Sequence, residues 1–159
     1  MEKRVEEFHR KSGEILRMAL HVETTLDFFI SNYFCYPQTY RTFLLNDSIL
    51  IKMGFERKIK IFEEICKKEE IGPEEYRETI RAMNYVKDKR NKVAHYEAFV
   101  SNPEEGIKLQ PRKSEIFGRE VLKLTDELIK KIDEERLSAI QGVTKIHLKL
   151  NEKLRKKWS

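Results

Sequence analysis

The chain has few of the residues that break helices or cross-link a fold. Its 159 residues include only six glycines, four prolines and two cysteines. So few helix breakers, combined with 37% charged and 40% hydrophobic residues, favour a mostly helical chain with exposed Lys and Glu pairs. The two cysteines, Cys35 and Cys66, cannot make a disulfide framework, and both fall among apolar residues of expected helices. We expect them to be buried free thiols in a reducing cytoplasm.

Long apolar runs are also missing from the sequence. No stretch approaches the ~18 uninterrupted apolar residues that a membrane span needs, and the first residues contain no run typical of a signal peptide. We therefore expect a cytoplasmic protein with no membrane anchor. Only three glutamines accompany the many lysines and glutamates, a composition that leans towards thermophilic proteins.

Several motifs of common enzyme classes are absent. The four histidines are scattered and neither cysteine has the spacing of a metal ligand, which argues against a metal site. No glycine-rich phosphate loop indicates a nucleotide-hydrolysing motor, and no nucleophile elbow indicates a Ser-His-Asp hydrolase. We expect no cofactor.

The net charge of +5 is concentrated near the C-terminus. From residue 145 onward there are six Lys or Arg residues and a single acid, Glu152, so the preceding residues are balanced overall. Such a segment is compatible with attraction to nucleic acid. It is equally compatible with cations that favour the C-terminal end of a helix, so both interpretations stay open.

Apolar residues repeat with helical spacing over most of the chain. The expected helices cover residues of about 2–34, 39–51, 55–66 and 73–95, with one or two more from about 119 to the end. Gly142 is a candidate break in the last of these, and the turn-like segment 102–106 predicts a small β-hairpin. We therefore predict an all-α fold, an antiparallel bundle of four to six helices with a β-hairpin after the fourth. It forms a single domain, 1–159, with a basic helical extension from about 136.

Arg90 lies where packing alone would not put it. At about 100° per residue it falls in the middle of the apolar arc of the fourth helix, while Asn91 and His95 share the neighbouring edge. The apolar arc consists of Tyr76, Ile80, Ala82, Met83, Val86, Val93 and Ala94. A guanidinium in an apolar face is costly unless it is paired, so something must require Arg90 there.

The first helix contains a matching anomaly. Beside its main core stripe runs a second stripe that is apolar except for Glu23 and Asp27. The second stripe consists of Leu16, Leu20, Glu23, Asp27, Ile30 and Phe34. These carboxylates could neutralise Arg90, because a guanidinium binds a carboxylate through two parallel hydrogen bonds. A buried ion pair that sets the helix register is thus one interpretation of all three charges.

The other interpretation is chemical. His95 can exchange a proton near neutral pH and so act on a ribose 2′-hydroxyl or a leaving oxygen, with Asn91 orienting its ring. Arg90 can stabilise the charge that develops on the phosphate oxygens. Together these groups suffice for metal-free cleavage of RNA, although a histidine at a helix end is more often a surface or capping residue.

The segment Arg90-Asn91-Lys92-Val93-Ala94-His95 resembles the signature of the HEPN family: an arginine, four residues and a histidine, with a polar residue directly after the arginine. Segments 22–30 and 54–59 are also similar to stand-alone bacterial and archaeal members. The resemblance covers about residues 1–135. It implies a homodimer of helical bundles in which the arginine and histidine of both protomers line a shared cleft.

The resemblance further implies a metal-independent endoribonuclease of a toxin–antitoxin, phage-defence or RNA-processing system. Arg90 and His95 would be catalytic, Asn91 would position them, and Glu23 with Asp27 would supply the acidic partner of Arg90. An antitoxin or a nucleotidyltransferase is an implied partner.

One residue departs from the pattern of the toxins regulated by nucleotidyltransferases. Those toxins have a tyrosine two positions after the histidine, where this chain has Glu97, and Tyr96 follows His95 directly. Regulation through that tyrosine is therefore not expected. Other members keep the bundle but only bind nucleotides or proteins, so a non-catalytic dimeric module that binds RNA, nucleotide or a partner is the alternative. A helical scaffold is a third interpretation.

Overall fold

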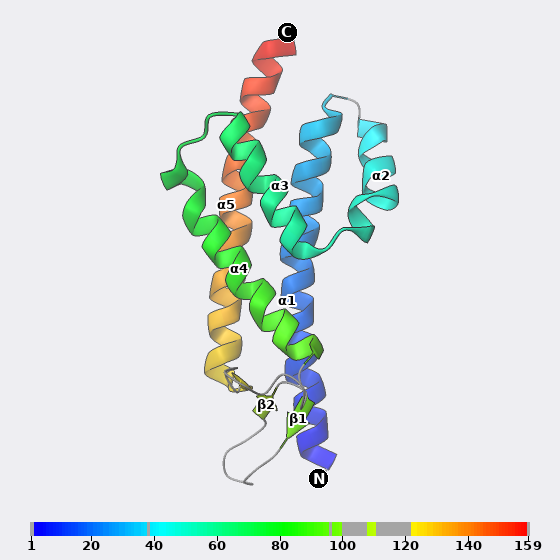
Figure 1. Cartoon of the computed structure of the whole chain (residues 1–159), viewed down its shortest axis with the longest axis vertical. Helices are drawn as coiled ribbons and strands as arrows, with labels where there is room; N and C mark the ends of the chain where they lie inside the picture. Colours follow the sequence, from blue (N-terminus) through cyan, green and yellow to red (C-terminus); the bar gives the residue numbers. More distant parts are fainter. Residues whose placement is uncertain (1, 38, 96, 100–107, 111–121, 159) are drawn as a thin grey trace.

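The computed structural model describes residues 2–37, 39–95, 97–99, 108–110 and 122–158. The helices are α1 (Glu2–Cys35), α2 (Thr39–Ser48), α3 (Phe55–Lys68), α4 (Pro73–His95) and α5 (Asp126–Trp158), with a short 3₁₀ turn, η1 (Leu50–Lys52), after α2. Successive helices alternate in direction, and the two ends of the chain lie at opposite ends of the molecule (Figure 1). The predicted all-α bundle is confirmed.

The core lies between α1, α3, α4 and α5, and these helices bury most of the residues on their main apolar stripes, although Val5, Leu16 and Leu20 of α1 are exposed. The largest fully buried side chains include Ile15, Leu26 and Phe29 of α1, Phe62 of α3, Met83 of α4 and Ile132 and Ile146 of α5. α2 contacts α1 alongside the upper half of the bundle, and α4 ends against the lower half of α1 (Figure 1).

Gly142 does not interrupt α5, contrary to the break considered from the sequence. A Cβ atom at Gly142 would collide with the side chain of Thr79 in α4. The glycine therefore permits a close approach of α4 and α5 rather than a break.

The predicted hairpin is also confirmed. Strand β1 (Glu97–Phe99) pairs antiparallel with β2 (Lys108–Gln110), and β3 (Leu122–Lys123) adds a third strand that the sequence did not predict. The last helix consequently begins at Asp126 and not near residue 119. The hydroxyl of Thr125 accepts a hydrogen bond from the backbone N–H of Leu128 (3.1 Å), which caps the first turn of α5.

Both cysteines are free thiols, as expected. Cys66 is buried in the core, and this burial raises the pKa of its thiol to about 12. Cys35, near the end of α1, is only partly buried. Within the described residues, no helix combines the length and the hydropathy that crossing a bilayer requires.

Candidate functional site

Arg90 lies in the last two turns of α4, in line with the buried residues Met83 and Val86 and before Val93. Its side chain is partly buried, and its Nη1 donates a hydrogen bond to Oδ1 of Asn91 (3.1 Å). The amide side chain of Asn91 thus holds the Arg90 guanidinium in place. Of the expected apolar arc, Tyr76, Ala82, Met83, Val86 and Val93 are buried, whereas Ile80 is partly buried and Ala94 is exposed.

His95 is the last residue of α4 and is exposed. Asn91 was expected to orient this imidazole, but in the described part of the chain its side chain accepts a hydrogen bond from Arg90 instead. Asn91 therefore positions the guanidinium. His95 lies about one helical turn after Asn91, and its exposed ring is accessible to a bound molecule.

Glu23 and Asp27 do not pair with Arg90, and this expectation was wrong. Lys58 of α3 takes both carboxylates: its Nζ lies 2.9 Å from Oε1 of Glu23 and 2.8 Å from Oδ1 of Asp27. Lys58 is only 2% exposed, so the three groups form a buried cluster. Burial raises the pKa of Asp27, and the nearby Lys58 opposes this rise.

The physical reason for this correction is the position of the helices. α3 packs against α1, whereas Arg90 comes from the end of α4, beside the lower half of α1 (Figure 1). The signal was present in the sequence, because Lys58 shares the apolar face of α3 with Ile59, Phe62 and Ile65. A lysine in such a face needs counter-charges, just as the arginine does. The α1–α3 cluster is therefore structural, and the described residues contain no group of three His, Cys, Asp or Glu side chains that could hold a metal ion.

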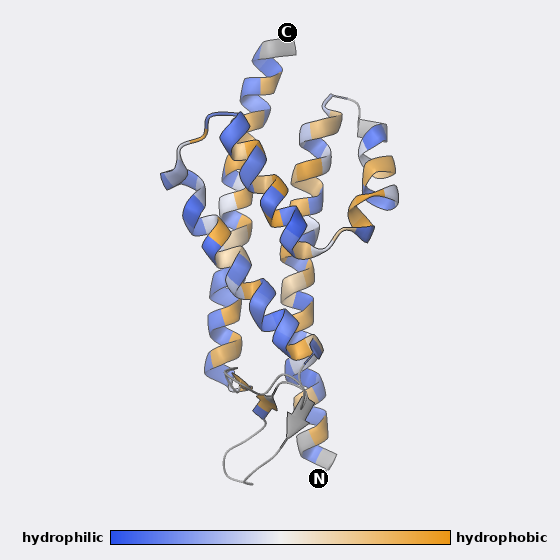
Figure 2. Cartoon of the chain, viewed as in Figure 1, coloured by the Kyte–Doolittle hydropathy of each residue, from blue (hydrophilic) through white to orange (hydrophobic). Residues whose placement is uncertain are grey.

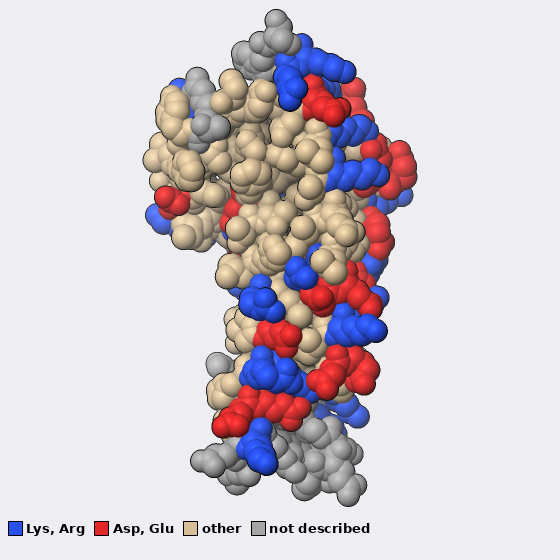
Figure 3. Space-filling view, turned by 180° about the vertical axis from the view of Figure 1, so that it is seen from behind, with Lys and Arg blue, Asp and Glu red and all other residues tan. Residues whose placement is uncertain are grey.

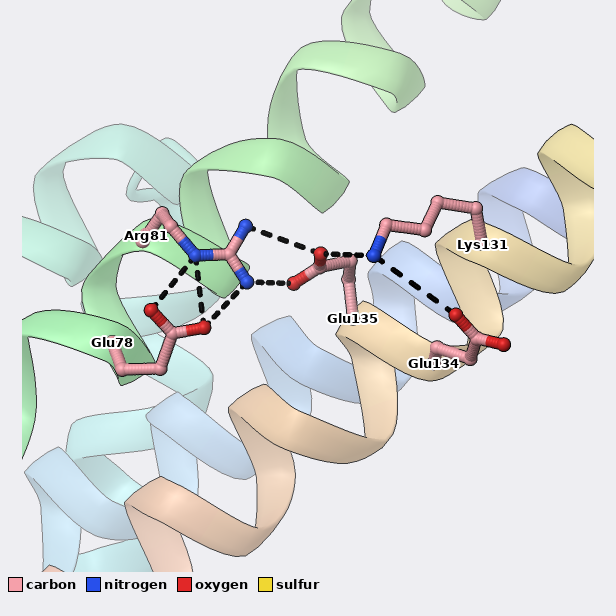
Figure 4. A network of polar contacts seen from close by, with 5 residues as sticks. All are labelled: Glu78, Arg81, Lys131, Glu134 and Glu135. Atoms are coloured by element: carbon pink, nitrogen blue, oxygen red, sulfur yellow. Dashed lines mark hydrogen bonds and ion pairs between the residues drawn. The ribbon is translucent and has the colours of Figure 1, made fainter.

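A second ionic cluster, which the sequence analysis missed, joins α4 to α5 (Figure 4). Glu135 is 3% exposed, and both its oxygens accept hydrogen bonds from Arg81, at 3.1 and 2.6 Å. Lys131 adds an ion pair to Glu135 (3.1 Å), and Arg81 also binds Glu78. The Arg81 guanidinium lowers the pKa of Glu135. This network braces the helix that carries Arg90 and His95.

His147 occupies a half-buried site between α1 and α5. Its ring lies against Phe28 and Phe29, and its Nε2 is 3.2 Å from the amide nitrogen of Asn32 and 2.8 Å from that of Asn151. Since an amide nitrogen only donates, the single lone pair of Nε2 is the acceptor that both amides face. Burial lowers the pKa of His147. These contacts join α1 to α5 within the bundle, so we interpret His147 as a packing residue.

The basic C-terminal segment lies at the opposite end of the molecule from Arg90 and His95 (Figure 1). Two of its lysines bind acids of the bundle: Lys149 pairs with Glu75 (2.7 Å) and Lys153 pairs with Glu69 (3.0 Å). Within one chain this segment does not contribute to the candidate site, and part of its charge stabilises the end of α5.

No protein-family model matches the chain, and no similar curated protein or solved structure was found.

Proposed function

We propose that this chain is a metal-independent endoribonuclease that acts as a homodimer, with Arg90 and His95 as catalytic residues and Asn91 as a positioning residue. The proposal rests on the environment of the Arg90 guanidinium. The guanidinium is partly buried, and no ion pair joins it to a carboxylate among the described residues. A partly buried cation without a counter-charge is unfavourable, and an RNA phosphate would supply the missing negative charge.

The loss of the expected carboxylate partner strengthens this interpretation. Had Glu23 neutralised Arg90, the guanidinium would have had a sufficient structural role. Because Lys58 takes both carboxylates instead, the only partner of the Arg90 guanidinium within the described residues is the amide of Asn91, and its other donors could bind a ligand. Arginine suits this task because its planar fork matches two oxygens of a phosphate.

The chemistry follows from the two side chains. The imidazole of His95 takes the proton of a ribose 2′-hydroxyl, whose oxygen attacks the adjacent phosphorus. The bond from phosphorus to the 5′-oxygen breaks, and an imidazolium returns a proton to that leaving oxygen. Arg90 stabilises the negative charge on the phosphate oxygens during the attack. The products are a 2′,3′-cyclic phosphate and a 5′-hydroxyl, and no metal ion takes part in these steps.

The test is digestion of single-stranded RNA by the purified protein in EDTA. The native chain should produce ends with a 2′,3′-cyclic phosphate, and His95→Ala should lower the rate by roughly 10²–10⁴-fold. His21→Ala is the matched control, because His21 is also an exposed histidine, lies on α1 and contacts Arg136 instead of the site. Its rate should equal that of the native chain.

Two results would contradict the proposal. If His95→Ala still cleaved RNA at the native rate, the activity would belong to another site or to a contaminant. If the native chain bound RNA but never cut it at any excess of protein, the alternative would hold: a non-catalytic module that uses the same residues for binding.

A further inference from the structure

A hollow lies between the end of α1 and α3, in the upper half of the molecule as drawn in Figure 1. Its volume is about 510 Å³, which lies within the ~300–1,000 Å³ of sites that bind small molecules. We call it the upper hollow. Residues of these two helices line it, whereas Arg90 and His95 lie at the lower end of α4.

One wall of the upper hollow is apolar. Tyr33 and Phe34 of α1 contribute two aromatic rings in edge-to-face contact, with their centroids 5.1 Å apart, and Ile61 and Ile65 line the hollow from α3. Phe34 is 62% exposed, so its ring is available to a bound molecule. Aromatic and branched side chains of this kind favour a ligand with an apolar body.

Tyr33 is held in place by the bundle before any ligand binds. Its hydroxyl donates a hydrogen bond to Oε1 of Glu69 (2.7 Å), and Oε2 of Glu69 pairs with Lys153 of α5 (3.0 Å). Burial and the bond to Glu69 raise the pKa of Tyr33 to about 12, so the ring stays uncharged at neutral pH. The aromatic wall is therefore preformed, which lowers the ordering cost of binding.

The α3 side of the upper hollow is basic. Arg57, Lys60 and Lys68 line it together with a single acid, Glu64. Lys60 pairs with Glu56 (3.0 Å), which lies outside the lining. Among the described residues neither Arg57 nor Lys68 has an ion pair, although Glu64 lies only four residues before Lys68. An anionic group in the hollow would give these two cations a partner.

These charges are a local feature of α3. Figure 2 shows that the viewed side of α3 is largely hydrophilic. Figure 3 shows the opposite side of the molecule, where most of the broad upper half is free of Lys, Arg, Asp and Glu. The cations beside the apolar wall are therefore not part of an even distribution of the net charge of +5.

The two walls restrict the chemistry of a ligand. Glu64 lies between Lys60 and Lys68 along α3, four residues from each, and would repel a ligand with several negative charges. The apolar wall offers no hydrogen bond to the polar edge of a nucleobase, because the Tyr33 hydroxyl already donates to Glu69. A nucleobase would therefore lose hydrogen bonds to water there without replacing them.

We propose that the upper hollow binds a small organic carboxylate with an aromatic or branched apolar body. The basic residues of α3 hold the carboxylate, and Phe34 and Ile61 contact the body. This binding site is distinct from Arg90 and His95 and does not depend on the proposed nuclease function.

The experiment is an NMR titration of the full chain with 2-naphthoate, followed through the methyl groups of labelled isoleucines. The methyls of Ile61 and Ile65 should shift because they line the hollow, whereas those of Ile15 and Ile132 in the core should not. A ligand of this size is expected to reach a dissociation constant on the order of 1 mM or tighter.

Two further probes separate the charge from the body. 2-Naphthalenemethanol, which has the same body without the charge, should bind roughly 10-fold more weakly than 2-naphthoate, since each of two exposed ion pairs adds up to about fivefold. Adenosine monophosphate, which carries an anionic group on a polar base, should also bind more weakly than 2-naphthoate.

A pair of variants tests the aromatic wall. Phe34→Ala should weaken the binding of 2-naphthoate by roughly 5–10-fold. Phe28→Ala is the matched control, because Phe28 is comparably exposed (56%) on the same helix but lies outside the lining. Its affinity should equal that of the native chain.

The cations are tested in the same way. Arg57→Gln combined with Lys68→Gln should weaken the binding of 2-naphthoate by roughly 10-fold and leave that of 2-naphthalenemethanol unchanged. Lys67→Gln combined with Lys130→Gln removes the same charge from exposed positions outside the lining, and should change the affinity by less than about twofold. All these positions are exposed, so each variant should keep the helical circular-dichroism spectrum of the native chain.

Any of four results would overturn this inference. The methyls of Ile61 and Ile65 could fail to respond to 2-naphthoate, or the uncharged alcohol or adenosine monophosphate could bind as tightly as the carboxylate. Phe28→Ala could weaken binding as much as Phe34→Ala, or the control pair of lysines as much as Arg57 and Lys68. None of these measurements involves RNA cleavage, so the nuclease proposal stands or falls separately.

Discussion

Two regions of this molecule hold charges at apolar positions, and they differ in what neutralises them. In the α1–α3 cluster, Lys58 is almost completely buried and binds two carboxylates within 2.9 Å. At the end of α4, Arg90 is partly buried and bonds only to a neutral amide among the described residues. A buried charge whose counter-charges lie within the chain has a structural explanation, whereas a charge without them points to a ligand.

The largest expected effect tests the structural side of this comparison. Lys58→Met should lower the free energy of unfolding by roughly 3–5 kcal/mol, because it leaves Glu23 and Asp27 without their cation. Urea denaturation followed by circular dichroism measures the change. Lys60→Met is the control on the same helix, since Lys60 is exposed and pairs with the exposed Glu56. Equal stabilities of the two variants would show that the cluster does not hold α1 to α3.

The α4–α5 cluster should give a smaller loss. Arg81→Met removes two hydrogen bonds from the buried Glu135, but Lys131 remains paired with it, so we expect a loss of roughly 1.5–3 kcal/mol. The same denaturation experiment measures it. A loss as large as that of Lys58→Met would mean that Lys131 does not compensate for the missing guanidinium.

The dependence of stability on pH should separate the two clusters further. Arg81 lowers the pKa of Glu135 below its usual 4.5. The stability that the ionised Glu135 contributes is therefore fully present above about pH 4.5 and is lost as the pH falls through the lowered pKa. Asp27 should have the opposite effect on stability. Because its pKa is raised above 3.8 in the folded state, protonation of Asp27 on acidification stabilises the folded state. When the pH is lowered from neutral to about 4, the urea concentration at the unfolding midpoint should therefore fall less for Arg81→Met than for the native chain. A greater fall for the variant would contradict the assignment to Glu135.

The smallest change in stability is expected at Arg90, near the end of α4. Arg90→Met should change the free energy of unfolding by less than about 1 kcal/mol, because this guanidinium pairs with no carboxylate in the part of the chain that the structure describes. The same variant should lose the proposed RNA cleavage. Arg77→Met, at an exposed position of the same helix, should affect neither. If Arg90→Met lowered the free energy of unfolding by several kcal/mol, Arg90 would have a structural role like that of Lys58. The main support for the nuclease proposal would then be removed.

Much of the fold could be predicted because helix formation depends on residues close in sequence. The spacing of apolar residues located α1, α3 and α4, and Pro73 marked the start of α4. The start of α5 was missed because Leu124 fits a helical stripe with Leu128 and Ile132, yet Leu122 and Lys123 form β3 and the cap at Thr125 sets the boundary. The charges at apolar positions could be found from the sequence, but the partner of Glu23 and Asp27 could not.

The sequence by itself determined which residues form helices and which charges fall on apolar faces, since both depend on spacing along the chain. Only the tertiary structure decided that Lys58 and not Arg90 neutralises Glu23 and Asp27, and that α2 turns its apolar side outward. Pairing and exposure depend on which helix packs beside which. That arrangement brings together groups far apart in sequence, and no local pattern records it.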